Sequence, residues 1–308
     1  MLAKASAVTK TRFIMMKKLL SIFLLIVFLA SCQSATPRDS GKPFVVTSIP
    51  PYVSLVQTIV GDTMTIASAL GGSFDPHTTE ITPSQMKKVQ NANLFIGVGE
   101  AYENKLIRAI NRGAGSVAVL ELDKKVSLLS FSHDTSAVDA CHDVNLHMGG
   151  AKDLHIWLGP QILIPQVSAM VEALSILNPV HANQYSENGK ALIKKIKEID
   201  QNLQEELRLF QKKAIIVSHP ALGYFCHEYN MTQIAVECEG KEPLAKDATN
   251  ILRLAKNSDV VCVFTAPQFN NRGAKLIAEK LNLRVESFDP LAPDPLETIQ
   301  QIAKAITK

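Results

Sequence analysis

Three histidines occupy positions from which side chains commonly reach a ligand. His77 lies between a predicted strand and a predicted helix, His155 lies at the entry to a long helical region, and His219 directly follows an apolar strand. Ligands of α/β proteins bind at the carboxyl ends of strands. A single histidine is usually satisfied by local hydrogen bonds, but three at such positions indicate one shared site.

The chemistry that suits three histidines is the binding of a divalent metal. Neutral imidazole is a good zinc ligand, and one carboxylate or water completes a tetrahedral shell. Asp289, at the end of the predicted strand 284–288, is our candidate for the fourth ligand, although a capping or turn role before Pro290 explains it almost equally well. Glu80 and water stay open as alternatives.

A zinc-dependent envelope hydrolase would use the same number of protein ligands. The sequence lacks the motifs that would mark such an enzyme. His227-Glu228 is not followed by the second histidine of a His-Glu-x-x-His helix, and the chain has no Gly-x-Ser-x-Gly elbow, phosphate-binding glycine loop or dinucleotide fingerprint. The pattern favours metal binding without catalysis.

Alternating strands and helices must position these residues, and they predict an α/β fold. Predicted strands cover 44–49, 64–70, 94–98, 117–122, 214–218, 232–237, 260–265 and 284–288. Predicted helices cover 52–60, 83–92, 103–112, 221–229, 245–255, 271–281 and 295–306. We expect two lobes, each with a parallel sheet flanked by helices, at residues 44–178 and 213–308.

A long helical region, 160–211, separates the two alternating series. Asn178-Pro179 should end its first helix and start a second. In the second helix, apolar residues recur at helical spacing: Leu192, Ile193, Ile196, Ile199, Leu203, Leu207 and Phe210. We expect residues 179–212 to connect the lobes.

The N-terminus has the features of an export signal. Lys17-Lys18 precede the apolar run Leu19–Leu29, which is too short to span a bilayer permanently. Leu29-Ala30-Ser31-Cys32 resembles a bacterial lipobox, in which the cysteine is acylated. We therefore expect a lipoprotein signal peptide at 1–32, a lipid anchor on Cys32 and a flexible tether at 33–43; a plain signal peptide with a chance cysteine is the alternative.

The charge of the chain limits the classes of partner, and its cysteines allow disulfides in an oxidising compartment. Without the basic residues before Cys32, the chain has 27 basic and 29 acidic residues, so no basic surface for nucleic acid is expected. We expect a membrane-anchored protein on the periplasmic or extracytoplasmic face of a bacterial envelope. In that compartment disulfides can form, and Cys226 with Cys238 is the pairing that the sequence favours.

Three motifs carry a family resemblance. Asp75-Pro76-His77, the segment 153–160 and the segment 218–225 resemble, in order, the ligand motifs of metal-binding solute-binding lipoproteins of ABC importers, in the zinc-uptake branch. The resemblance covers roughly residues 44–308. It implies two α/β lobes with a rigid connecting helix, Zn²⁺ captured between them as transported ligand, and delivery to a permease powered by an ATPase. We expect a monomer.

His219 bears on the choice of metal, because manganese-type relatives tend to have a carboxylate there. A manganese or iron importer is the sibling alternative, and an adhesin without a small ligand would leave the three histidines unexplained. The sequence departs from the family pattern at Leu154, Gly159 and Ala266, none of which is a proposed ligand.

The polar stretch 123–153 is too long for an ordinary connection. It contains seven residues that can bind metal: His133, Asp134, Asp139, Cys141, His142, Asp143 and His147. Zinc-uptake relatives often carry a His- and acid-rich loop here that is proposed to collect metal. A solvated loop with scattered histidines explains this sparse version equally well.

Overall fold

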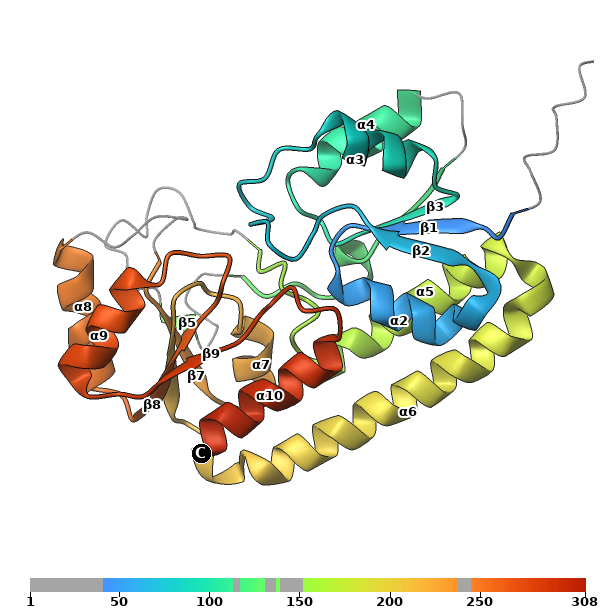
Figure 1. Ribbon diagram of the computed structural model, residues 1–308. Helices are drawn as coiled ribbons and strands as arrows, with labels where there is room; N and C mark the ends of the chain where they lie inside the picture. The colour runs from blue at the N-terminus through green and yellow to red at the C-terminus, as the bar shows by residue number, and fades with distance from the viewer. Residues whose placement is uncertain (1–40, 113–116, 131–136, 139–151, 238–244) are drawn as a thin grey trace, which may run out of the picture. The chain divides into compact units, whose positions relative to one another are not determined.

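The computed structural model of the protein describes residues 41–112, 117–130, 137–138, 152–237 and 245–308 (Figure 1). The described helices and strands all belong to one compact unit, Lys42–Lys308. The predicted signal peptide, with Cys32, and most of the tether lie outside the described residues.

The first sheet has the strand order β2-β1-β3-β4, and each pairing is parallel. Its strands are β1 (Phe44–Thr47), β2 (Thr65–Ser68), β3 (Leu94–Gly97) and β4 (Ala118–Glu121). The helices α2 (Pro51–Val60), α3 (Pro83–Gln90) and α4 (Glu103–Arg112) are the crossovers. All four residues of β3 are buried, which explains why the central strand is apolar throughout.

The second sheet has the order β5-β7-β6-β8-β9, again with parallel pairings. Its strands are β5 (Ala137–Val138), β6 (Ala214–Val217), β7 (Thr232–Ala235), β8 (Val260–Thr265) and β9 (Val285–Ser287). The helices α7 (Gly223–Glu228), α8 (Ala245–Lys256) and α9 (Arg272–Leu281) follow its strands. The edge strand β5 comes from the polar stretch 123–153, for which the sequence pattern predicts no strand.

Three further helices are α5 (Pro160–Leu177), α6 (Ala182–Glu206) and α10 (Pro295–Thr307), and both α5 and α10 pack against α6. Figure 1 shows α6 passing beneath α2 and α10, and the residue contacts agree. The break between α5 and α6 falls at Asn178 and a 3₁₀ turn, Pro179–His181, as the proline predicts. Other 3₁₀ turns are Gly61–Thr63, Asp123–Lys125 and Arg208–Phe210.

Among the described helices, α5 alone is long and apolar enough to cross a membrane by length and composition. Its residues Leu163, Val167, Met170 and Leu174 are fully buried, and it packs along α6. In this structure α5 is therefore a core helix.

The predicted fold class is confirmed: two parallel sheets flanked by helices, with a long helix between the two series. The 25-residue α6 is the long connecting helix. The parallel pairing of the strands determines where a binding site can form. In a parallel sheet all carboxyl ends lie at one edge, so the loops after β2, β6, β8 and β9 can reach a common site.

Candidate metal centre

His77 is held by the loop between β2 and α3. Asp75 accepts a hydrogen bond from the His77 backbone through Oδ1 (2.9 Å) and one from the Thr78 hydroxyl through Oδ2 (2.8 Å). These bonds form a local turn that holds the backbone at His77. Its Nδ1 lies 3.3 Å from Oε2 of Glu100, a buried residue beyond the end of β3.

His155 has a similar local turn in a more buried place. Asp153 Oδ1 accepts hydrogen bonds from both the backbone nitrogen (2.9 Å) and Nδ1 (2.8 Å) of His155. The Asp153 backbone carbonyl accepts a hydrogen bond from the Tyr224 hydroxyl, so α7 fixes this segment. A Cβ at Gly223 would lie 2.3 Å from Asp153 Oδ2, which explains the glycine there.

His219 follows β6 and is also buried. Its Nδ1 lies 3.0 Å from Oε2 of Glu237, which follows the neighbouring strand β7. The Phe269 ring stacks on the imidazole with a centroid distance of 3.8 Å and an interplanar angle of 8°. The ring therefore has a carboxylate at one nitrogen and an aromatic cover on its face.

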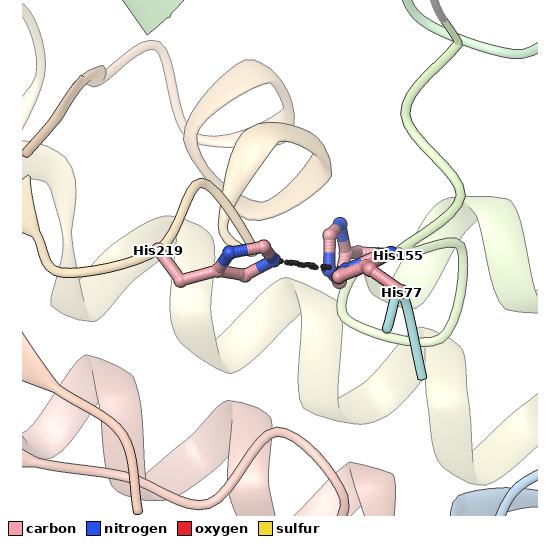
Figure 2. A group of neighbouring side chains, drawn as sticks. All are labelled: His77, His155 and His219. Carbon is pink, nitrogen blue, oxygen red and sulfur yellow. Dashed lines mark hydrogen bonds between the residues drawn. The ribbon is translucent and has the colours of Figure 1, made fainter. Parts of the chain in front are cut away.

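The three histidines converge through their Nε2 atoms (Figure 2). Nε2 of His219 lies 3.1 Å from Nε2 of His77 and 3.1 Å from Nε2 of His155. Two nitrogens bound to one tetrahedral zinc ion at 2.0–2.1 Å would lie about 3.3 Å apart. The observed separations are close to the spacing that zinc requires.

The carboxylates determine which ring nitrogen is free. Each Nδ1 faces one carboxylate, that of Glu100, Asp153 or Glu237. In a neutral imidazole the proton then resides on Nδ1, and the Nε2 lone pair points toward the centre. Three lone pairs directed at one point form a metal-binding arrangement.

Electrostatics favours a neutral ring at His219. Burial lowers the pKa of His219 well below its usual value, and proximity to His155 and His77 lowers it further. Burial lowers the pKa of His77 as well, but its hydrogen bond with Glu100 and nearby negative charges outweigh this and leave the pKa raised. At His219 at least, protons compete poorly for the nitrogen that would bind a metal.

Sequence reasoning missed the three carboxylates and Phe269. The role of Asp153 could have been predicted from the sequence, because the Asp-x-His spacing of residues 75–77 recurs at 153–155. Glu100 and Glu237 lie beyond other strands, and no local pattern connects them to their histidines. Ala266, a departure from the family pattern, is held by its backbone, which exchanges hydrogen bonds with the Asn271 side chain.

Asp289 and Glu80 do not join the histidines in the structure. Among the described residues, the group of ligand atoms lying within 4.8 Å of one another belongs to His77, His155 and His219. Asp289 Oδ1 instead accepts hydrogen bonds from Gln268 Nε2 (2.6 Å) and the Leu291 backbone (2.8 Å). Glu80 is largely exposed and pairs with Lys105. A fourth protein ligand remains a prediction.

Other sequence predictions fall outside the described residues. They concern Cys32, Cys238 and the seven candidate metal-binding side chains of the polar stretch. Cys226, the predicted partner of Cys238, is a free and fully buried thiol, as is Cys262. Burial raises the pKa of both thiols, so both are protonated at neutral pH.

Comparison with known proteins identifies the family. The family model described as zinc-uptake complex component A, periplasmic, matches residues 45–308. The chain belongs to this family. It is a solute-binding protein of the periplasmic or extracytoplasmic compartment that works with an ABC uptake system, and it is not an enzyme. The hydrolase alternative is thereby excluded.

Individual relatives agree in sequence and fold. A protein of Chlamydia trachomatis described as metal-binding is 27% identical over 285 residues, covering 92% of this chain and 98% of that protein. The high-affinity zinc uptake system protein ZnuA of Bacillus subtilis is 24% identical over 288 residues, covering 90% of each chain. A solved ZnuA deletion mutant with zinc bound is 26% identical, with a TM-score of 0.75, covering 87% of this chain and 97% of that one.

Proposed function

We propose that His77, His155 and His219 bind one Zn²⁺ ion as cargo, which the protein then passes to the permease of its ABC importer. The observation that carries this proposal is the convergence of three Nε2 atoms, each on a ring whose Nδ1 faces a carboxylate. Family membership and the zinc-binding relatives support the same function.

The charge around the three rings suits a divalent cation. Glu100 and Asp153 are almost completely buried, and Glu237 is partly buried. Buried charge is costly unless it is compensated, and a bound Zn²⁺ would offset much of the negative charge carried by these groups. The site thus combines neutral ligands with anionic support behind them.

The ligand set favours zinc over a harder metal. Imidazole nitrogens suit zinc, whereas carboxylate and water oxygens suit manganese. Three protein ligands leave a fourth position for water or for a further side chain. Asp289 is the candidate for that position from the sequence, but in this structure it accepts hydrogen bonds from Gln268 and Leu291, and the Asp289→Asn variant described below decides between a ligand and a positioning role.

Calorimetric zinc titration with a competing chelator tests the proposal. We expect tight binding by the wild-type protein and a loss on the order of 100-fold or more for His77→Ala, His155→Ala or His219→Ala, because each change removes one of three ligands. His227→Ala is the matched control, since His227 is exposed on α7. Wild-type zinc affinity in the triple variant would refute the site.

We also propose that Cys32 carries a lipid that anchors the protein to the membrane and that the protein acts as a monomer. The lipobox-like sequence Leu29-Ala30-Ser31-Cys32 supports the anchor. Metabolic labelling with palmitate tests it: Cys32→Ala should abolish incorporation, and labelling of that variant would contradict the proposal. A mass measurement in solution tests the monomer.

A further inference from the structure

Gln268 lies where loops of the two lobes meet. It follows β8, in the loop that ends at α9, and its Nε2 donates to two acceptors. One is the backbone carbonyl of Gly72, in the loop that carries His77 (2.6 Å), and the other is Oδ1 of Asp289 (2.6 Å). Gly72 and Gln268 are 196 residues apart, so the bond joins the two lobes.

The chemistry of the three groups fixes the direction of these bonds. A carbonyl oxygen and a carboxylate oxygen can only accept, and the amide nitrogen of Gln268 has two protons to donate. A flipped amide would place Oε1 against both acceptors, so the hydrogen-bond network selects the observed orientation. Gln268 is therefore required as a double donor at this place.

The loop that contains Gln268 also reaches the histidine cluster. The next residue, Phe269, stacks on His219. The Asn271 side chain donates to the backbone carbonyls of Ala266 (2.8 Å) and Phe269 (3.0 Å), which holds the loop in shape. One short loop thus contacts the His77 loop through one side chain and His219 through its neighbour.

The segment after Asp289 completes the connection. Asp289 Oδ1 accepts from the Leu291 backbone, which fixes the turn that follows β9. The carbonyl of Pro290, within this turn, accepts a hydrogen bond from Nε1 of Trp157 (2.7 Å). Trp157 is two residues beyond His155, and their rings lie 5.4 Å apart. All three histidine-bearing segments therefore contact the loops after β8 and β9.

We propose that Gln268 is a positioning residue for zinc binding, and that the Gln268–Asp289 pair is a latch that ties the His77 loop to the C-terminal lobe. In this proposal, which rests on the proposed zinc function, Asp289 acts through Gln268 rather than on the ion. Because His77 is the most exposed of the three histidines, its position depends most on such a bond. Breaking the latch should release zinc faster.

The decisive variant is Gln268→Glu in the full mature chain. It preserves the shape of the side chain but replaces the double donor with an acceptor that faces a carbonyl and a carboxylate. We expect zinc binding weaker by about tenfold or more, mainly through faster dissociation, from the loss of two hydrogen bonds and the added repulsion. Zinc titration and stopped-flow transfer of zinc to a chelator measure the two quantities.

Emission of Trp157, the single tryptophan of the chain, reports on the site in the same samples. The melting temperature of the metal-free protein separates an effect on zinc from a folding defect, and Gln268→Ala removes the donor without adding charge. Gln268→Ala should weaken zinc binding in the same direction.

Asp289→Asn distinguishes a latch from a ligand. The asparagine side chain retains an oxygen acceptor for Gln268, so we expect zinc affinity within about threefold of wild type. In the double variant Gln268→Glu/Asp289→Asn, the new amide can donate to the new carboxylate, and part of the lost affinity should return.

The outcomes separate the latch from the proposed function. If the wild-type protein does not bind zinc, the proposed function fails. If it binds zinc and folded Gln268→Glu and Gln268→Ala have wild-type affinity and dissociation rates, the latch is overturned. If Asp289→Asn weakens binding as much as His77→Ala, Asp289 is a zinc ligand and its assignment to the latch is wrong.

Discussion

Each proposed zinc ligand is one half of a carboxylate–histidine pair. The carboxylate holds the Nδ1 proton, orients the ring and increases the basicity of Nε2. Asp153 is a local partner two residues before its histidine, whereas Glu237 lies 18 residues after His219 and reaches it across neighbouring strands. Loss of such a partner should weaken metal binding without removing a ligand.

Glu237→Gln tests this role. The amide keeps the size of the side chain and an oxygen acceptor but loses the negative charge near His219. We expect zinc affinity to fall by about 10–100-fold, as measured by competition with a chelator. Glu80→Gln is the matched control, because Glu80 is exposed and pairs with Lys105, and should bind zinc as the wild type does. Equal affinities for both variants would contradict the role of Glu237.

Helix α7 caps the start of helix α5. Gly159, the first residue before α5, has no side chain with which to cap the helix. Glu228 of α7 supplies the acceptors, because its two carboxylate oxygens receive the backbone amides of Gln161 (3.1 Å) and Ile162 (3.2 Å). A Cβ at residue 159 would lie 2.5 Å from Glu228 Oε1. The glycine that departs from the family pattern thus makes room for a cap from another helix.

Glu228→Ala should therefore destabilise the fold. It leaves two amides at the start of α5 without their acceptor, and we expect the free energy of unfolding to fall by about 1–2 kcal/mol. Urea unfolding of the metal-free protein measures the change. Glu228→Gln, which retains one acceptor oxygen, should lose less. An unchanged urea midpoint and slope in the alanine variant would show that the cap does not stabilise α5.

A buried carboxyl group, that of Glu103, couples the folding of the whole protein to pH. Glu103, at the start of α4, hydrogen-bonds with the Ser48 hydroxyl and with the backbone amides of Val98 and Gly99. Burial raises its pKa from 4.5 to about 7 despite these hydrogen bonds. The folded protein therefore binds a proton that the unfolded chain has already released in this pH range.

The pKa of Glu103 is higher in the folded protein than in the unfolded chain. Protonation of Glu103 therefore stabilises the folded protein, fully below pH 4.5, and this stabilisation is lost as pH rises through about 7. This pKa shift of Glu103 corresponds to at most about 3 kcal/mol in the free energy of unfolding. Glu103→Gln, a neutral mimic of the protonated acid, should remove this decline. Urea unfolding of both metal-free proteins at pH 5 to 8 measures the difference, and parallel pH profiles would contradict the assignment.

The sequence was most informative where structure is local. Apolar periodicity and the position of Pro179 place α5 and α6 close to their observed bounds, because helix period and proline chemistry depend on near neighbours. The tendency of ligands to bind at the carboxyl ends of strands pointed to His77 and His219, which the structure places in one group with His155. The edge strand β5 was missed, since two residues in a polar stretch carry no strand pattern.

The sequence by itself predicted the fold class and pointed to the three histidines that the structure brings together, because side-chain type and chain period can be read directly from it. Only the tertiary structure decided what surrounds them. Glu100 meets His77, Phe269 covers His219, and Gln268 joins the loop of Gly72 to Asp289. These contacts depend on strand order and on how two lobes meet, and no local rule of spacing contains that information. Asp289 illustrates the limit: the sequence places it at the correct edge of the sheet, but only the packed loops show which group it contacts.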